Sequence, residues 1–243
     1  TVMERLRQAR IRAGFRRLRR IVCLMEPDAR AFESWLGSTN IVTASYPQDY
    51  LGYADPTALD DRPLTPPIRV LLGNSAHSLP DYWDALPVLA PLAGRIKLTA
   101  MLNYGREGRE EEVSRFEKEA ARLFPSAFHP WREVEPMDRY MQILKTNDIY
   151  ICPTPTQSGL HALYSMLMFG KKAYLRGANL AWARTLGFRV FDFDDLKADA
   201  SSESIAVPLP GEEKRANFSV IQKRFDPAVL RARWKSLYEK MVC

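Results

Sequence analysis

One stretch of the sequence limits the possible folds more than any other. Residues 146–176 read TNDIYICPTPTQSGLHALYSMLMFGKKAYLR. Ile149–Cys152 is a short apolar run that prolines stop, which is the pattern of a buried strand. Apolar residues then recur at helical spacing from Leu160 until Gly170, and a second apolar run follows at 173–175. A strand, a polar turn, a helix and a strand within about thirty residues predict a βαβ unit with parallel strands.

The turn of this unit is expected at the carboxyl edge of the parallel sheet. The backbone N–H groups of Gln157, Ser158 and Gly159 would lie at the helix N-terminus, where unpaired donors and the positive end of the helix dipole bind a phosphate. Gly159 would let the anion approach closely, and His161 in the first helical turn would lie near it. Alternatively, Ser158 only caps the helix and Gly159 only relieves a turn. The stretch by itself leaves both interpretations open.

Strands and helices continue to alternate from residue 68 onward. We predict strands at 68–72, 96–100, 127–128, 149–152, 173–175 and 188–191. We predict helices at 80–92, 107–123, 137–144, 160–169 and 227–238. About six strands interleaved with helices indicate an α/β fold, a Rossmann-like doubly wound parallel sheet.

Ligands of such sheets bind outside the carboxyl ends of the strands. The polar turns expected there are Gly73–Ser78, Asn103–Gly105, His129–Trp131 and Gln157–Gly159, and we expect all four to meet in one crevice. The candidate binding residues are Gly73, Asn74, Ser75, His77, Tyr104, Trp131, Gln157, Ser158, Gly159 and His161. None of the turns is a GxGxxG or Walker loop, so the sequence gives no sign of a dinucleotide cofactor or of ATP hydrolysis. Polar turns with glycine and a nearby aromatic suit a nucleotide diphosphate group.

Two of these candidates have ordinary alternatives. His77 follows a strand and can donate to a phosphate or a sugar, but a histidine in a loop can also be simply solvated. Trp131 can stack on a nucleobase, but an aromatic residue beside a proline is also typical of packing. The sequence does not decide between these roles.

The first part of the chain is an incomplete α/β pattern. It predicts a strand at 21–25, a helix at 27–36 and a strand at 40–44, followed by a proline-rich connection at 45–67. Two strands and two helices cannot bury both faces of a parallel sheet, and the first residue is Thr1. We therefore expect domains at 1–62, the end of an N-terminal α/β domain truncated upstream together with a linker, and at 63–243, the Rossmann-like domain with a C-terminal helix.

Composition narrows the possible classes of protein. The three cysteines lie far apart and lack metal-ligand spacing, which argues against a zinc site or a disulfide framework and suggests a reducing cytosol. No apolar run approaches the roughly 20 residues that span a bilayer, and no signal peptide is visible. The net charge of +6 is concentrated in residues 1–20, which contain eight arginines and only one acidic residue, Glu4.

These arginines predict a basic amphipathic helix at 3–20. Its thin apolar stripe would let it lie on an anionic membrane surface or contact phosphate, and the alternative is a solvated helix face. Nucleic acid is not expected as a partner, because no recognisable nucleic-acid module accompanies the arginines.

Three segments carry a resemblance to a known family. In order they are VLLGNSAHSLPDYWDAL, LTAMLNYG and EPMDRYMQILKTNDIYICPTPTQSGLHALYSMLMFGKKAYL. Together they resemble the donor-binding half of the bacterial TDP-N-acetylfucosamine:lipid II N-acetylfucosaminyltransferases, which are GT-B glycosyltransferases. A weaker resemblance reaches back over 18–47, so most of the chain is covered.

The resemblance implies a function. An inverting enzyme would transfer a dideoxy, N-acetylated sugar from a nucleotide diphosphate donor, dTDP-linked as in this family, to a polyprenyl-linked saccharide acceptor in the synthesis of a bacterial surface polysaccharide. It would need no metal and no cofactor, and it would work in the cytoplasm, peripheral to the inner face of the membrane. Residues 1–62 would end the acceptor-side domain, and 63–243 would bind the nucleotide sugar.

The chain departs from related patterns at informative places. Many retaining GT-B enzymes hold the ribose with a glutamate about five residues before the glycine that ends the central helix, where this chain has Ser165. The catalytic residues stay unknown, because the general base would lie upstream of Thr1, so we expect this chain to bind a donor without transferring its sugar. Asp192-Phe193-Asp194 has the spelling of a metal-binding triplet, but we interpret it as the start of a helix after a strand.

Two other functions stay open on the sequence. One is a nucleotide-sugar epimerase of the same architecture, which would keep its acid and base residues in this crevice. The other is a non-catalytic nucleotide-binding domain at a membrane surface.

Overall fold

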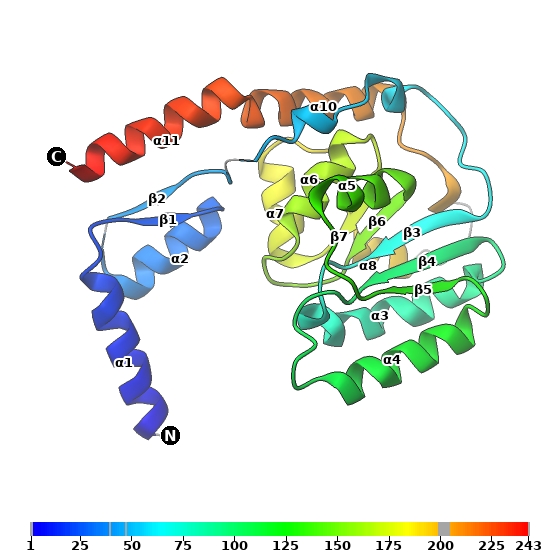
Figure 1. Ribbon diagram of the computed structural model, residues 1–243, viewed down its shortest axis with the longest axis horizontal. Helices are drawn as coiled ribbons and strands as arrows, with labels where there is room; N and C mark the ends of the chain where they lie inside the picture. The colour runs from blue at the N-terminus through cyan, green and yellow to red at the C-terminus, as the bar shows by residue number, and fades with distance from the viewer. Residues whose placement is uncertain (1, 39, 47, 199–204, 243) are drawn as a thin grey trace. The chain divides into compact units, whose positions relative to one another are not determined.

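The computed structural model describes residues 2–38, 40–46, 48–198 and 205–242, and the chain is shown in Figure 1. It forms two compact units. The larger is Gly52–Ile221, and the smaller is Thr1–Leu51 together with Gln222–Cys243. The predicted domain boundary at residues 62 and 63 stays a prediction.

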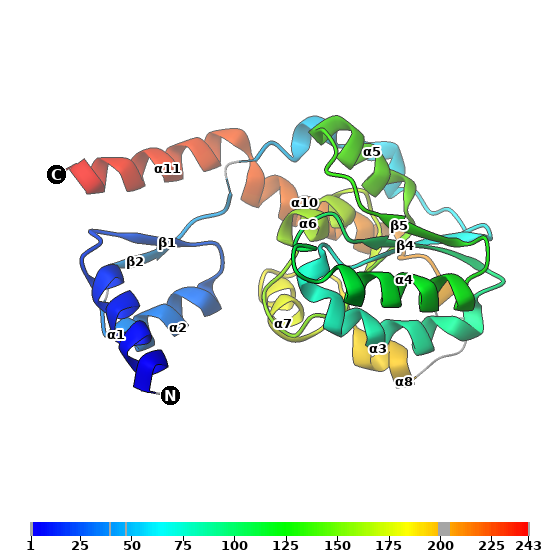
Figure 2. The ribbon, with the colours of Figure 1, turned by 60° about the horizontal axis from the view of Figure 1, so that its bottom comes forward.

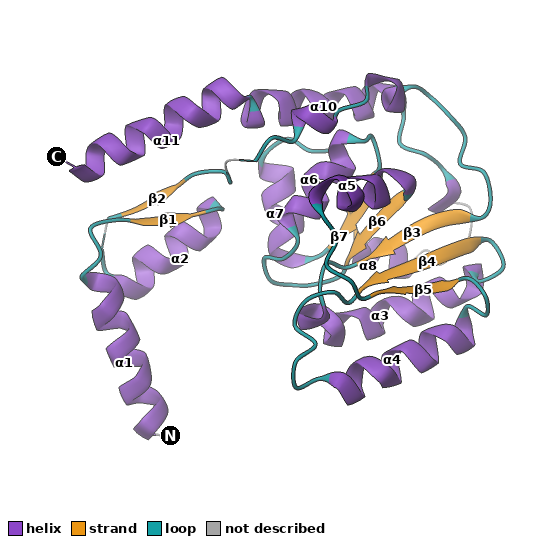
Figure 3. Cartoon of the chain, viewed as in Figure 1, coloured by secondary structure: helices purple, strands orange, loops and turns teal. Residues whose placement is uncertain are grey.

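The larger unit contains a sheet of six parallel strands. They are β3 (Ile68–Leu72), β4 (Ile96–Met101), β5 (Phe128–Trp131), β6 (Ile149–Cys152), β7 (Lys172–Leu175) and β8 (Phe191–Asp192), drawn in orange in Figure 3. Their order in the sheet is β5-β4-β3-β6-β7-β8. The order reverses between β3 and β6, which pair in parallel with Val70 opposite Ile149 and Leu72 opposite Ile151. This is the doubly wound Rossmann-like topology that the alternation of strands and helices predicts.

Helices cover both faces of the sheet. Figure 2 shows α3 (Leu79–Leu89) and α4 (Glu110–Leu123) on one face, and α5 (Met137–Thr146) and α6 (Leu160–Met168) on the other. On the α3 side, alternate strand residues such as Val70, Leu72 and Ile151 share a buried core with apolar residues of α3 and α4. All four residues of β6 are buried, as expected for a central parallel strand with helices on both faces.

Two segments of the large sheet differ from the sequence-based predictions. His129–Trp131 was expected to form a turn but belongs to strand β5, with Thr99 opposite His129 and Met101 opposite Trp131. This prediction was wrong because β5 is at the edge of the sheet, where Pro130 is tolerated without breaking the strand. The last strand begins at Phe191 rather than 188, and the backbone of Arg189 is held instead by two hydrogen bonds with the side chain of Asn217.

Several helices of the larger unit have no counterpart among the predicted elements. They are α7 (Gly177–Thr185) and α10 (Gly211–Phe225), together with the short 3-10 helices η2 (Pro56–Leu59) and η3 (Ala76–Ser78). A further 3-10 helix, η4 (Ala90–Leu92), is the last part of the helix predicted at 80–92. Helix α8 (Phe193–Ala198) confirms the interpretation of the Asp-Phe-Asp triplet as a helix start. The side chain of Asp192 accepts a hydrogen bond from the N–H of Asp194 at 2.9 Å, which caps this helix.

The smaller unit contains a two-stranded parallel sheet of β1 (Ile21–Cys23) and β2 (Ile41–Thr43). Helix α1 (Val2–Arg16) and helix α2 (Glu26–Leu36) pack through the rings of Phe15, Phe32 and Trp35, which meet edge to face. Helix α11 (Pro227–Val242) is attached to the segment after β2 by Trp234, whose indole N–H donates to the carbonyl of Ser45 at 3.0 Å.

The described part of the chain contains no helix that combines the length and the apolar character needed to cross a bilayer.

Candidate functional site

The candidate site lies where the strand order of the large sheet reverses. From β3 the chain continues into α3 on one face, and from β6 it continues into α6 on the other. The turns that follow β3 and β6 therefore meet at the carboxyl edge, which is the position where open α/β sheets bind ligands. The sequence placed Gly73–Ser75 and Gln157–Gly159 in these two turns.

The turn after β3 is shaped around one tyrosine. Gly73 has a φ of +69°, and a Cβ atom at this position would lie 1.9 Å from the Tyr82 ring. The fully buried Tyr82 hydroxyl accepts hydrogen bonds from the N–H groups of Asn74 at 2.7 Å and Ser75 at 3.0 Å. It donates to the carbonyl of Ser75 at 2.8 Å, and burial raises its pKa well above the ordinary value. Because Tyr82 already uses both amides, this turn presents side chains rather than backbone N–H groups to a ligand.

A direct hydrogen bond joins the two turns. The Ser158 hydroxyl donates to Asn74 Oδ1 at 2.8 Å, although the two residues are 84 positions apart in sequence. The Ser78 hydroxyl lies 3.3 Å from that of Ser158 and 3.5 Å from Asn74 Oδ1. With its oxygen engaged in this way, the Asn74 carboxamide keeps its Nδ2 hydrogens for another acceptor. Asn74 is therefore the side-chain donor of the site.

Gly159 is the residue before the first residue of helix α6, and it has a φ of +62°. A Cβ atom there would lie 2.7 Å from Asn74 Cβ and 2.8 Å from the Tyr150 hydroxyl oxygen, so only glycine fits without a shift. The Ser158 N–H is directed to Asn179 Oδ1 at 3.3 Å. Within the described residues, the N–H groups of Gln157, Gly159 and Leu160 have no protein acceptor. These three amides at the positive end of α6 are available to an anion.

The turn before α6 is held in place by the segment that follows β7. Arg176 donates to the carbonyl of Pro153 at 3.3 Å, and the N–H of Ala178 donates to that of Pro155 at 2.9 Å. The fully buried Asn179 donates to the Ser158 carbonyl and accepts from its N–H. The sequence analysis missed these residues. The available signal was a strand followed by Arg-Gly-Ala-Asn, which is another polar turn at the same edge of the sheet.

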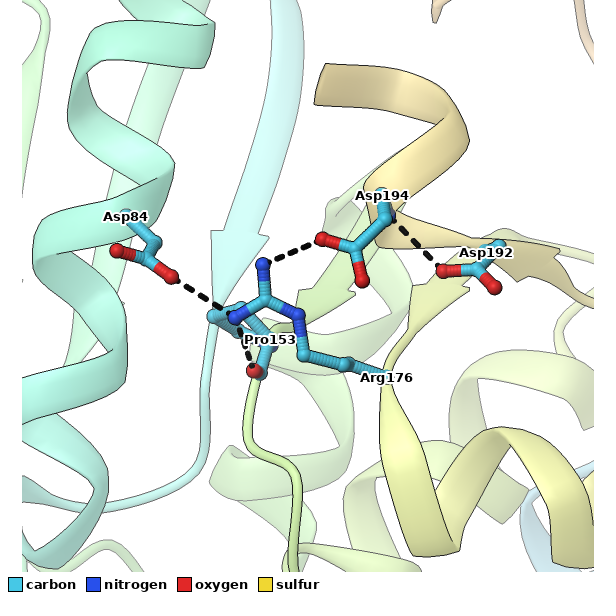
Figure 4. A network of polar contacts seen from close by, with 5 residues as sticks. All are labelled: Asp84, Pro153, Arg176, Asp192 and Asp194. Carbon is cyan, nitrogen blue, oxygen red and sulfur yellow. Dashed lines mark hydrogen bonds and ion pairs between the residues drawn. The ribbon is translucent and has the colours of Figure 1, made fainter. Parts of the chain in front are cut away.

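Arg176 is the centre of a charged cluster on the α3 side (Figure 4). Its guanidinium donates to Asp84 at 2.8 Å and to Asp194 at 2.6 Å, and it lies 4.8 Å from the centre of the Phe193 ring. Asp194 is thus paired with a cation, while Asp192 caps α8. No group of three or more His, Cys, Asp or Glu side chains with the spacing of a metal site occurs in the described ranges.

His77 and Tyr104 come together beside the turn after β3. The exposed His77 ring covers Gly105, where a Cβ atom would lie 2.5 Å from the ring. The N–H of Ala76 donates to the carbonyl of Tyr104 at 2.7 Å, and 53% of the Tyr104 side chain surface is exposed. The structure therefore brings the turns after β3 and β4 together, as the sequence analysis expected, and leaves both side chains accessible.

Trp131 and His161 lie in a largely buried aromatic cluster. The ring of Tyr140 lies 5.5 Å from that of Trp131 and 5.2 Å from that of His161. Trp131 is only 3% exposed, so a nucleobase could stack on it only if Tyr140 moved. Burial lowers the pKa of His161 to about 4, so its imidazole is neutral at pH 7. It can act there as a hydrogen-bonding group but not as a cation.

The residue at the position of the ribose-binding glutamate is buried. The Ser165 side chain has no exposed surface, and its hydroxyl donates to the sulfur of Met141 on α5 at 3.6 Å. Ser165 therefore belongs to the packing between α5 and α6.

Comparisons with known proteins identify the fold. A scan against family models finds no match, and neither does a search of curated proteins. Among solved structures, Anabaena Alr3699/HepE in complex with UDP and glucose is similar, with a TM-score of 0.71, 11% identity and coverage of 96% of this chain and 67% of that one. A glycosyltransferase from Rickettsia africae has a TM-score of 0.66 and 11% identity, over 92% of this chain and 64% of that one.

A third similar structure comes from work on glycosyltransfer with retention by trehalose-6-phosphate synthase, with a TM-score of 0.65 and 14% identity over 91% of this chain and 61% of that one. The chain thus spans about two thirds of the length of the structures it resembles. The fold is the α/β Rossmann-like doubly wound sheet of GT-B glycosyltransferases, as predicted. The narrower assignment to the TDP-N-acetylfucosamine:lipid II transferases stays a prediction.

Proposed function

We propose that this chain is the donor-binding part of a glycosyltransferase and holds a nucleoside-diphosphate sugar where the turns after β3 and β6 meet. The observation that carries the proposal is the Ser158–Asn74 hydrogen bond, which fixes a side-chain donor beside the free amides of α6. The diphosphate would accept hydrogen bonds from Asn74 Nδ2 and from the N–H groups of Gln157, Gly159 and Leu160. His77 and Tyr104 would contact the part of the ligand outside the diphosphate.

This arrangement suits the departure of a nucleoside diphosphate. When the bond between the sugar and the distal phosphate breaks, the leaving oxygen keeps the electron pair and negative charge grows on it. Fixed N–H donors and the positive end of α6 would stabilise that charge without a metal ion. In the inverting reaction that we propose, the acceptor hydroxyl attacks from the opposite face of the sugar and gives its proton to a general base. None of the residues named above is assigned as this base.

The finer proposals concern the two substrates. We propose a dTDP-linked dideoxy, N-acetylated sugar as donor and a polyprenyl-linked saccharide as acceptor, in the synthesis of a bacterial surface polysaccharide. The support is the resemblance of the three sequence segments that include both turns. The solved HepE structure contains UDP, so the donor base needs a direct comparison of nucleotides.

Nucleotide binding tests the proposal. At a concentration of about 100 times Kd, a nucleotide that binds only the folded chain stabilises it by roughly 2.7 kcal/mol. We expect this with dTDP, measured by thermal unfolding and titration calorimetry beside UDP, GDP and CDP. If none of the four stabilises the chain, the proposed site is wrong.

Two variants locate the binding. Asn74→Asp keeps the shape of the side chain and the acceptor of the Ser158 hydroxyl, but replaces the donor with a negative charge. Gly159→Val places a branched side chain against Asn74 and the α6 amides. Both should abolish nucleotide binding. Gly94→Val is the matched control, because a Cβ atom at Gly94 has no neighbour within 4 Å.

A transfer assay separates the proposal from its rivals. Release of nucleoside diphosphate that depends on a polyprenyl-linked acceptor indicates a transferase, whereas conversion of the donor without acceptor indicates an epimerase. Binding with neither reaction, both in this chain and in a longer protein that carries it, fits a nucleotide-binding domain. Because the chain spans only about two thirds of its structural neighbours, the assay should include any longer protein that carries it.

A further inference from the structure

A second polar cavity lies at the opposite edge of the large sheet. Its volume is about 380 Å³, within the range of about 300–1,000 Å³ typical of small-ligand sites. Its walls come from the segment 55–65, the residues at the amino ends of β3, β6 and β7, and the segment 208–214 before and within α10. Since all these strands are parallel, this edge is the opposite end of the sheet from the proposed nucleotide site at the turns after β3 and β6.

The lining of this cavity is strongly basic. Its cationic side chains are Arg62, Arg69, Lys145, Lys171, Lys172 and Lys214. Among the residues that the structure describes, three carboxylates share the lining, those of Asp55, Asp60 and Asp148. The cations therefore outnumber the anions by three, which favours the binding of an anion with more than one charge.

Four of the cations already have partners. Lys145 pairs with Asp55 at 2.8 Å, and Arg62 lies 3.7 Å from Asp60. The ammonium groups of Lys172 and Lys214 are almost buried, and each donates to a backbone carbonyl, at 3.2 Å and 2.7 Å respectively. These contacts fix the walls of the cavity.

Two cations remain without such partners. Within the described part of the chain, neither the Lys171 ammonium nor the Arg69 guanidinium has a hydrogen bond or an ion pair. Burial lowers the pKa of Lys171, and the nearby charges of Lys214, Arg69 and Lys145 lower it further, opposed only by Asp148. A half-buried ammonium among like charges is unfavourable unless an anion joins it.

We propose that this cavity is an anion site for a phosphate-bearing ligand, with Lys171 and Arg69 as its charged contacts. Lysine and arginine are the side chains that proteins use to hold phosphate groups. The volume leaves room for a pyrophosphate or for a phosphate with a small attached group. The proposal does not depend on the nucleotide crevice, and a free phosphate compound and a lipid headgroup carry the same chemistry.

Pyrophosphate is the probe for a free anion. Its affinity is measured by calorimetry on chains that carry Asn74→Asp, because this substitution should abolish binding at the proposed nucleotide site. Lys171→Gln and Arg69→Gln should each weaken binding at least about tenfold, by analogy with about 1.4 kcal/mol for the loss of one charged contact. Lys118→Gln, on an exposed position of α4, removes the same charge outside the cavity and should have no effect.

A second measurement guards against a merely structural explanation. Because Lys171 is uncompensated without a ligand, Lys171→Gln should unfold at the same temperature as the wild type or higher when no anion is present, and should lose the stabilisation by pyrophosphate. If Lys171→Gln lowers the melting temperature of the free protein and leaves the affinity unchanged, the proposal is wrong.

Vesicles distinguish the two sources of phosphate. Binding of pyrophosphate that depends on Lys171 indicates a free phosphate compound. Binding to phosphatidylcholine vesicles with phosphatidic acid that depends on Lys171, without binding of pyrophosphate, indicates a lipid headgroup. If neither form of binding depends on Lys171 and Arg69, the cavity is not an anion site.

Discussion

The Tyr82 hydroxyl offers the sharpest test of how the site is built. Tyr82→Phe removes one oxygen atom and leaves the ring in place. That oxygen accepts from the N–H groups of Asn74 and Ser75 and donates to the Ser75 carbonyl. The substitution therefore leaves two backbone donors without a protein partner, at the turn that carries the Asn74 side chain, whereas the Ser75 carbonyl still accepts from the N–H of Ser78 at 3.2 Å.

The loss of unfolding free energy in Tyr82→Phe depends on how deeply these backbone groups are buried. A buried polar group that loses its partner costs about 1–3 kcal/mol. Ser75 is 6% exposed, so its N–H should cost close to the full amount, whereas water can reach the half-buried Asn74. We expect the free energy of unfolding to fall by about 2–4 kcal/mol. For a unit of this size that corresponds to a lower melting temperature by roughly 5–15 °C.

Urea unfolding with a matched tyrosine gives the comparison. Tyr164 is also buried, but its hydroxyl accepts a hydrogen bond from the indole of Trp182, at 3.1 Å, rather than from the turn after β3. Tyr164→Phe should cost about 1 kcal/mol and leave nucleotide affinity unchanged. Tyr82→Phe should cost more and should also weaken nucleotide binding, because the Asn74 backbone loses its anchor. If Tyr82→Phe costs no more than Tyr164→Phe, or if its nucleotide affinity equals that of the wild type, the reasoning about this turn fails.

Three further outcomes are expected. His161 is neutral in the folded chain down to about pH 4 but takes up a proton below about pH 6.5 when unfolded, so the chain loses stability as the pH falls through this window. Urea unfolding at several pH values should show a smaller loss of unfolding free energy for His161→Gln than for the wild type. Equal losses in the two proteins would contradict the lowered pKa. Nucleotide affinity should be the same in EDTA and in magnesium by calorimetry, and a requirement for magnesium would refute the role given to α6. Replacing Arg5, Arg7 and Arg10 of α1 by glutamine should lower the affinity for phosphatidylglycerol vesicles about 100-fold in a flotation assay, at about 1 kcal/mol for each arginine. Met3 and Leu6 on the same helix are 76% and 55% exposed and could contact the lipid. An unchanged affinity would exclude α1 as the membrane contact.

The sequence predicted the elements of the site well because they have strong local signals. β3 and β6 are short apolar runs with polar or proline boundaries, and their observed bounds are those predicted. The start of α6 after Gly159 follows from a glycine before a helical repeat of apolar residues. Such patterns reveal what a segment forms, but the adjacency of β3 and β6 depends on the whole topology.

The hydrogen bonds that complete the site join residues far apart in the sequence, and no local sequence pattern predicts them. Tyr82 is one of several apolar residues on α3, and nothing in its neighbourhood shows that its hydroxyl reaches back to the turn after β3. Asn179 and Arg176 stabilise the turn before α6 from a separate segment, at sequence separations of 21 and 23. Pro130 led to the wrong prediction of a turn at 129–131, because a proline often ends a strand but is accepted at a sheet edge.

The hydrogen bonds within the site determine which donors each of the two turns can offer to a ligand. In the glycine turn after β3, Tyr82 uses the amides of Asn74 and Ser75, so this turn contributes the Asn74 side chain instead. The turn before α6 loses the Ser158 amide to Asn179, and the anion is left with the amides on either side of it. Each turn thus uses some of its own donors to stay rigid and presents the remainder. In the transfer that we propose, a site built in this way would have little to reorganise when charge develops on the leaving phosphate, which is the condition for strong electrostatic stabilisation by fixed donors.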